Sequence, residues 1–166
     1  MGNVRDNSVN LILTDPPHSD RVPYLELSEL WNSILGFQSH FGSEIVISNA
    51  KERGKTPDIY TRDMNGLIRT SSRIMRDDAF LVMLYNARQE ERWAFVAQLI
   101  DESDDLEYLG QFPCNYSAGS VVQDNRKGSL KNDIALVFGK PNADSRRLRQ
   151  LANIPNWSKD VPNNGG

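Results

Sequence analysis

One segment near the start of the chain reads Asn10-Leu11-Ile12-Leu13-Thr14-Asp15-Pro16-Pro17-His18, and the rest of the sequence is interpreted from it. The apolar run Val9–Leu13 is short, branched and continuous, which is typical of a buried strand. Neither proline can donate a hydrogen bond to a strand ladder, so the strand has to end before them. Asp15 is therefore expected at the carboxyl end of a parallel-type strand, where open α/β sheets bind ligands.

The end of this segment resembles motif IV of the amino-methyltransferases that use S-adenosylmethionine. Their pattern is Asp, Asn or Ser, then Pro-Pro, then an aromatic residue. The resemblance implies methylation of an exocyclic amino group of adenine or cytosine, or, in relatives, of a glutamine amide. A carboxylate and a proline carbonyl are pure acceptors that can hold the two N–H groups of such an amine. The nitrogen lone pair then points at the methyl donor, so most of the catalysis is positioning.

The resemblance assigns catalytic roles to Asp15, Pro16, Pro17 and His18, and it places the cofactor against Thr14 and Asp15. His18 departs from the family pattern, which has an aromatic residue here to stack on a flipped-out base. An imidazole can also stack, and it can hydrogen-bond as well. By itself the segment also fits a simple strand-ending turn. The strand before it and the helix after it favour the methyltransferase interpretation.

A helix is predicted to begin at Pro23, which suits a first helical position, and to end near Gly36. Apolar residues recur in it at helical spacing and are expected to form a core face: Tyr24, Leu27, Leu30, Trp31 and Ile34. The segment from Thr14 to Trp31 as a whole resembles a group of bacterial and archaeal adenine-specific DNA methylase-like proteins. In that group an Asp-Pro-Pro-Tyr segment runs on into Val-Pro-Tyr and a Leu-Ser-aromatic helix.

Members of this family bind the cofactor through a Gly-rich loop after the first strand and an acidic residue that ends the next strand. Asp15 comes too early for either to precede it, and no Gly-x-Gly follows a strand-like run downstream. We therefore expect the carboxyl-terminal half of such an enzyme, with the other half removed, carried on another chain, or lost. The first strand would then have one bare face and one bare edge. A bare edge invites pairing, so we expect a homodimer through Val9–Leu13.

The expected fold class is α/β: a partial Rossmann-like methyltransferase fold lacking the N-terminal cofactor-binding half. Its sheet should be mostly parallel with one antiparallel strand. Residues 1–141 should form this catalytic half, and 142–166 a basic tail with a short helix followed by disorder. The predicted elements are strands at Val9–Leu13, Ala79–Tyr85, Leu106–Phe112 and Asn132–Phe138, helices at Thr61–Arg76 and Gln89–Ser103, a turn at Asp77-Asp78, and a short edge strand at Glu44–Ile47.

The 166 residues carry a net charge of −3, which gives nucleic-acid binding no support but does not exclude a local basic cleft. Candidate contacts to nucleic acid lie in two polar segments: Lys51, Arg53 and Lys55 in one, and Tyr116, Arg126, Lys127 and Lys131 in the other. Both segments also fit solvated surface loops.

The single cysteine, Cys114, suits a reducing cytoplasm. Two isolated histidines predict no metal site, and no apolar run approaches the ~20 residues of a membrane span.

The function expected from these observations is transfer of methyl from S-adenosylmethionine to the N6 of adenine in DNA, with this chain alone inactive. Two alternatives stay open. One is a non-catalytic DNA-binding or subunit-contact module that keeps the fold. The other keeps the chemistry and changes the substrate to RNA or a protein glutamine.

Overall fold

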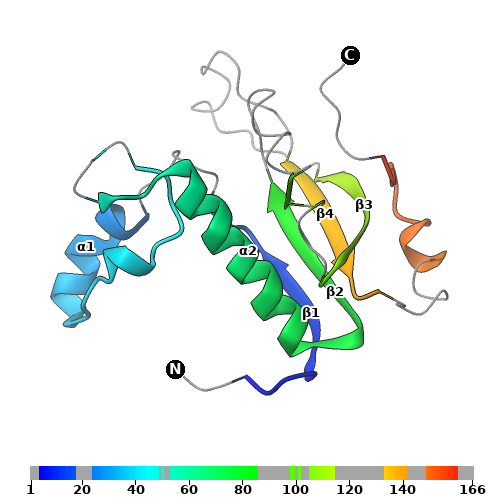
Figure 1. The fold of residues 1–166 in the computed structure, drawn as a ribbon, viewed down its shortest axis with the longest axis horizontal. Coiled ribbons are helices and arrows are strands. Elements are labelled where there is room, and N and C mark those ends of the chain that lie inside the picture. Colours follow the sequence, from blue (N-terminus) through cyan, green and yellow to red (C-terminus); the bar gives the residue numbers. More distant parts are fainter. Residues whose placement is uncertain are drawn as a thin grey trace, which may run out of the picture. The chain divides into compact units, whose positions relative to one another are not determined.

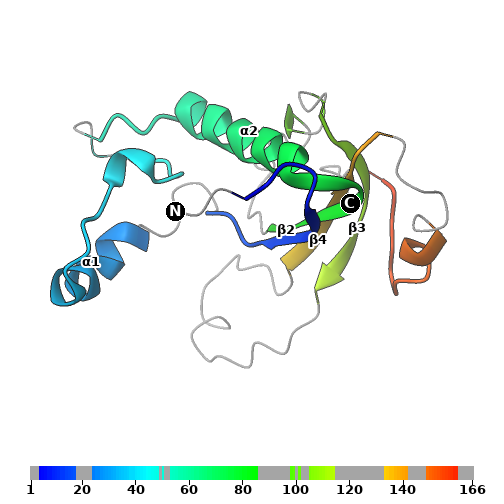
Figure 2. The same cartoon turned by 90° about the horizontal axis from the view of Figure 1, so that it is seen from below.

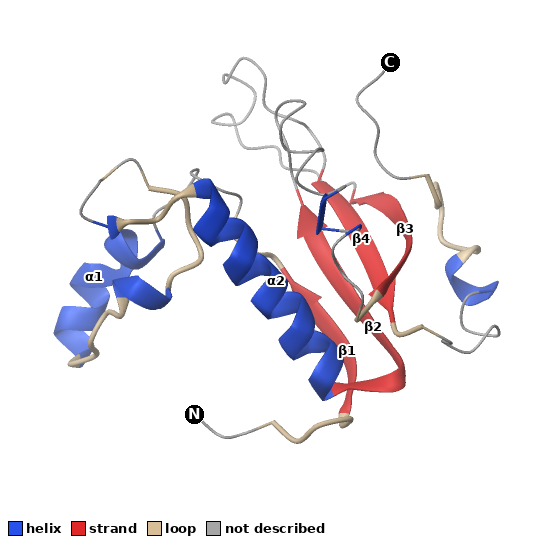
Figure 3. Cartoon of the chain, in the orientation of Figure 1, coloured by secondary structure: helices blue, strands red, loops and turns tan. Residues whose placement is uncertain are grey.

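The computed structural model describes residues 4–17, 24–48, 50, 53–85, 98–99, 101, 105–114, 133–141 and 149–160. Figure 1 shows their elements and Figure 3 separates helices from strands. In chain order these are β1 (Val9–Thr14), α1 (Tyr24–Leu35), the 3-10 helix η1 (Phe41–Ser43), α2 (Pro57–Ile74), β2 (Met75–Tyr85), β3 (Glu107–Cys114) and β4 (Asp133–Gly139). Helical residues 98, 99 and 101 fall within the predicted helix Gln89–Ser103, and the rest of that helix lies outside the described residues.

The chain divides into two compact units. The sheet unit comprises residues 1–16 and 65–166, and the helical unit comprises residues 17–64. The chain passes from one to the other between Pro16 and Pro17, and again within α2 between Met64 and Asn65. The predicted boundary after residue 141 stays a prediction.

The sheet unit contains a four-stranded sheet in the order β1-β2-β4-β3. β1 and β2 are parallel, whereas β4 is antiparallel to both of its neighbours. β1, β2 and β3 therefore run in one direction and β4, the last strand in the chain, runs between two of them in the other. Figure 2 shows the same sheet turned by a quarter rotation. An α/β fold with a mixed sheet and one reversed strand is confirmed, and the predicted strands are found with small changes at their ends.

Two parallel strands need a crossover connection, and α2 supplies the return to β2. The backbone N–H groups of Asn7 and Ser8 donate to the carbonyls of Arg73 and Ile74, at 3.1 and 2.8 Å, which ties the start of β1 to the end of α2. The predicted turn at Asp77-Asp78 is wrong. Both residues lie within β2, at a register break where the ladder passes from Met75 directly to Phe80.

The core of the sheet unit is centred on β2 and β4. Alternate residues of β2 are buried from Ala79 to Tyr85, as a strand with one fully covered face requires. On β4 the run Ala135–Phe138 is buried on both faces, and the strand itself lies between β2 and β3 in the sheet. Figures 1 and 2 show the C-terminal part of α2 beside the sheet, and its Ile68 is 2% exposed.

β1 is the edge strand of the described sheet, and the prediction that it is a buried strand is wrong. None of its residues is fully buried, and Leu11 and Leu13 are 57% and 66% exposed. Among the described residues no strand pairs with the outer edge of β1, and Leu11 and Leu13 are exposed on one of its faces. Pairing of that edge with a second chain remains a prediction.

Residues 149–160 of the predicted basic tail contact β3, which the sequence did not predict. Gln111 and Ser158 exchange two backbone hydrogen bonds of 2.8 and 2.9 Å, and the Trp157 ring stacks on Phe112. Gly110 has a φ of +146°, and a Cβ built there would lie 2.5 Å from the Trp157 ring. Only glycine leaves room for this close approach.

Beyond Trp157 the same segment reaches Tyr108, whose hydroxyl donates to the carbonyl of Asp160 at 3.2 Å. Burial, and then the Asp160 carboxylate, raise the pKa of Tyr108 to about 12. Because the folded pKa lies above the ordinary value of 10, this group's contribution to stability is complete below pH 10 and is lost as the pH rises towards 12.

In the helical unit, α1 forms as predicted, but its apolar face is not a core face. No residue of α1 is buried. The predicted edge strand Glu44–Ile47 is also wrong, since these residues form no strand. Two of their side chains are buried inside the helical unit: Glu44 is 9% exposed and Val46 is 4% exposed.

Candidate functional site

Asp15 directly follows β1 and is exposed. Thr14, the last residue of the strand, is half-buried and pairs with Met83 of β2. By this register Asp15 emerges at the level of Leu84, one residue before β2 ends at Tyr85. Because the two strands are parallel, their carboxyl ends lie at the same edge of the sheet, the edge at which α/β sheets bind ligands.

The two prolines after Asp15 are less exposed than Asp15 itself. Pro16 is buried and Pro17 is half-buried. The Tyr60 hydroxyl donates to the Pro17 carbonyl at 2.6 Å, across 43 positions of sequence. With both proline φ angles restricted and this carbonyl bonded, the backbone after Asp15 has little freedom.

Tyr60 was not predicted as a site residue. It lies in the first turns of α2, where Thr56 caps the helix through its Oγ1, 3.4 Å from the Ile59 nitrogen, and Pro57 takes the first helical position. Tyr60 is 3% exposed and shares a face with Met64 and Ile68. The spacing of these three residues would have identified Tyr60 as buried. Its bond to Pro17 could not be predicted in this way, because the two residues are far apart in the sequence.

The chemistry available at this place is hydrogen-bond acceptance. An exposed carboxylate and a backbone carbonyl next to it can accept hydrogen bonds but cannot donate them, which suits an NH2 group. Thr14 and Asp15, the residues expected to touch the cofactor, are both placed at the carboxyl end of β1. His18 lies outside the described residues.

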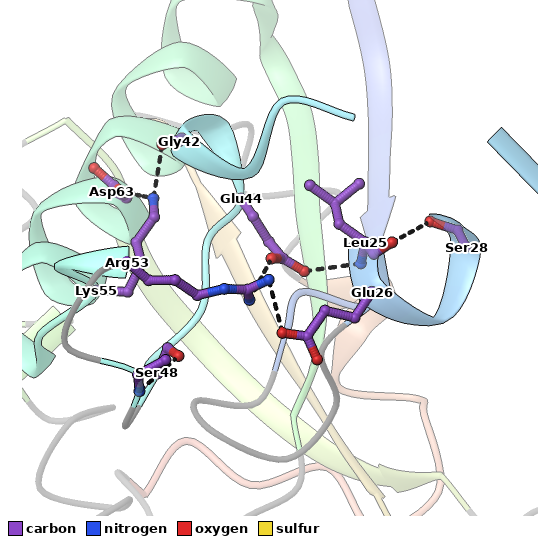
Figure 4. Close-up of polar contacts among 10 residues, drawn as sticks. Leu25, Glu26, Ser28, Gly42, Glu44, Ser48, Arg53, Lys55 and Asp63 are labelled. Carbon is purple, nitrogen blue, oxygen red and sulfur yellow. Dashed lines mark hydrogen bonds and ion pairs between the residues drawn. The ribbon is translucent and has the colours of Figure 1, made fainter. Parts of the chain in front are cut away.

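Arg53 and Lys55, two of the predicted contacts to nucleic acid, are paired within the helical unit, and their role towards phosphates stays a prediction. Figure 4 shows both cations turned into the helical unit. Arg53 lies 2.7 Å from a Glu26 oxygen and 3.7 Å from a Glu44 oxygen. Lys55 is 6% exposed, and its Nζ donates to the Gly42 carbonyl at 2.8 Å and lies 3.7 Å from an Asp63 oxygen. These cations bind the unit together, since each neutralises carboxylates inside it.

The remaining predicted contacts to nucleic acid fall outside the described residues: Lys51, Tyr116, Arg126, Lys127 and Lys131. In the described part of the chain, no group of three or more His, Cys, Asp or Glu residues is arranged to hold a metal ion. Among the helices that the structure describes, none is long and apolar enough to cross a membrane.

Comparison with known proteins does not assign a family, because no family model and no curated protein matches this sequence. A functional assignment therefore rests on the acceptors that follow β1 and on the bonds that hold them.

Proposed function

We propose that this chain holds the target amino group in a methyltransferase that transfers methyl from S-adenosylmethionine to the N6 of adenine in DNA. The observation that carries the proposal is the exposed Asp15 at the carboxyl end of β1, followed at once by the buried Pro16. The Asp15 side chain is exposed and the next residue is a buried proline with a restricted φ, and a positioning site needs such a fixed backbone.

In this proposal Asp15 accepts one N–H of the base and the Pro16 carbonyl accepts the other. Both bonds strengthen as the amine becomes positively charged during methylation, so they favour the transition state over the ground state. The Tyr60 hydroxyl, which donates to the Pro17 carbonyl, restricts the backbone immediately after Pro16. His18 is proposed to stack on the extruded base.

S-adenosylmethionine would supply an electrophilic methyl group on a sulfonium cation. A carboxylate at Asp15 is compatible with a nearby cation, and Thr14 and Asp15 are the only residues that we propose to touch it. Since these two do not make a complete cofactor site, we expect the 166-residue chain to bind S-adenosylmethionine weakly or not at all. Isothermal titration calorimetry should show no heat of binding, and a clear saturating signal would contradict this expectation.

The decisive experiment measures transfer of labelled methyl to mixed-sequence DNA by the full-length gene product. Asp15→Ala should abolish transfer, whereas Asp15→Asn, which keeps one oxygen acceptor, should retain part of it. Asp105→Ala removes an exposed carboxylate elsewhere and serves as the matched control. Full activity of the Asp15→Ala variant would refute the proposed role of this carboxylate.

The alternatives give different results in the same assay. An RNA or protein-glutamine methyltransferase would label RNA or a protein fraction instead of DNA, and the Asp15 variants would still lose activity. A non-catalytic module would label nothing. A subunit-contact module gains some support from the exposed apolar face of α1. We place the protein in the cytoplasm, in keeping with its single cysteine and with DNA as its partner.

A further inference from the structure

The largest exposed apolar surface on the described residues belongs to α1 and the loop after it. Tyr24, Leu27, Trp31 and Ile34 follow one another at intervals of three, four and three residues, the spacing of a seam between two packed helices. Leu30 and Leu35 flank this seam, and Phe37 follows it. We call these seven residues the α1 seam; each is between 48% and 67% exposed.

A side of α1 next to this seam attaches the helix to its own unit, and it does so through polar contacts. The Leu25 N–H donates to Glu44 at 3.0 Å, and the Asn32 side chain donates to the Ser39 hydroxyl at 2.8 Å. Figure 4 shows the first of these contacts beside the Arg53 ion pairs. The half-buried residues of the helix, Leu25, Ser28 and Asn32, lie on this side. The helical unit is therefore built with its apolar helix face turned outward.

The size of the α1 seam exceeds what a monomer ordinarily leaves in water. If each of the seven residues is given roughly 200 Å², the value for aromatic side chains, the exposed part of the seam is at most on the order of 900 Å². The largest apolar patch on a typical monomer is about 300–600 Å², and a stable interface takes about 800 Å² from each partner. The seam alone is thus large enough for a protein interface.

We infer that the α1 seam docks on the α1 seam of a second copy of this chain. A two-fold interface brings the same surface of two copies together, and a surface without charges can pack on its own copy without burying an unpaired ion. The seam contains no charged residue. The carboxylates of α1, Glu26 and Glu29, lie off the seam, and Glu26 is paired with Arg53. A nucleic acid is excluded as the occupant, because a polyanion requires cations.

The edge of β1 is the competing surface for self-association. It exposes the side chains of Leu11 and Leu13, a much smaller apolar area than the α1 seam. The α1 seam is therefore the better-supported interface, and variants of the two surfaces distinguish them.

Sedimentation equilibrium of the 166-residue chain over a wide concentration range tests the inference. The unmodified chain should be a dimer. The double variant Leu27→Lys/Ile34→Lys should raise the dissociation constant by roughly a hundredfold or more, since it places charges in the centre of the interface. Lysine is a good helix former, so circular dichroism should show an unchanged helix content. Leu13→Lys, the matched control on β1, should leave the dimer intact.

Three results would overturn the inference: an unmodified chain that stays monomeric, a double lysine variant that stays dimeric, or a dimer that dissociates only with Leu13→Lys. If the lysine variant loses helix, Leu27→Ala/Ile34→Ala replaces it. That pair should still weaken the dimer at least about tenfold, and an unchanged dissociation constant would count against the α1 seam.

Discussion

α1 and α2 carry the same kind of apolar pattern and have opposite surroundings. In α2 the stripe through Tyr60, Met64 and Ile68 is at most 3% exposed. In α1 the stripe through Leu27, Trp31 and Ile34 is more than 60% exposed. Helical periodicity therefore shows which face of a helix is apolar. It does not show whether another part of the same chain or a second chain packs against that face.

The way each helix is attached explains the contrast. α2 leads directly into β2, and Ile68, in the part of α2 that belongs to the sheet unit, is buried there. α1 is held by Glu44 and Ser39 through its polar side. Burial of α2 therefore stabilises the fold, whereas burial of α1 would stabilise an assembly.

The largest expected difference in the free energy of unfolding is between truncations in the α2 stripe and in the α1 stripe. Ile68→Ala should lower the free energy of unfolding by about 2–5 kcal/mol, because it opens a cavity in a packed core. Leu30→Ala should change it by less than about 0.5 kcal/mol. Urea denaturation at low protein concentration, where self-association contributes least, measures both values. Equal losses would mean that the α1 stripe is covered within the monomer.

The next effect concerns the polar attachment of α1. Glu44→Ala removes the acceptor of the Leu25 N–H and a partner of Arg53, and should cost about 1–3 kcal/mol. Glu44→Gln keeps an acceptor oxygen and should cost less. Hydrogen exchange of the Leu25 amide should accelerate in the alanine variant. If exchange is unchanged, the helix is not held through this bond.

A smaller effect should distinguish the tyrosines of the two helices. Tyr60→Phe removes only the hydroxyl that bonds the Pro17 carbonyl, and should cost about 1 kcal/mol. Tyr24→Phe, the same change at a residue that is 48% exposed, should be near neutral. Thermal unfolding followed by circular dichroism compares the two. A neutral Tyr60→Phe would show that the bond contributes nothing to the rigidity of the motif.

The smallest expected change in stability comes from replacing a glycine in each helix by alanine, and it should have opposite signs in α2 and α1. Gly66 lies inside α2, and a Cβ there would meet nothing within 4 Å, so Gly66→Ala should stabilise by about 0.5–1 kcal/mol. Gly36 also has open space, but it ends α1 with a φ of +72°, so Gly36→Ala should destabilise by about 1 kcal/mol. Denaturant midpoints give both signs, and a stabilising Gly36→Ala would mean that the end of α1 rearranges.

Much of the secondary structure was predictable because its signals are local. Apolar runs identified the four strands, and Pro16 and Pro17 located the end of β1 to within one residue. The position of Asp15 directly after β1 followed from the same signal. The Asp77-Asp78 turn was predicted wrongly, because an acidic pair is a usual turn signal and the register break that keeps it inside β2 depends on pairing with β1.

The sequence by itself determined where β1 stops, which residues follow it, and which helix faces are apolar, because these properties depend on neighbours along the chain. Only the tertiary structure decided that β4 runs between β2 and β3. The same is true of the ion pairs that Arg53 and Lys55 form with carboxylates of their own unit, and of the hydrogen bond from Tyr60 to Pro17. Each of these depends on residues brought together from distant positions, and their contact energies exceed any local preference.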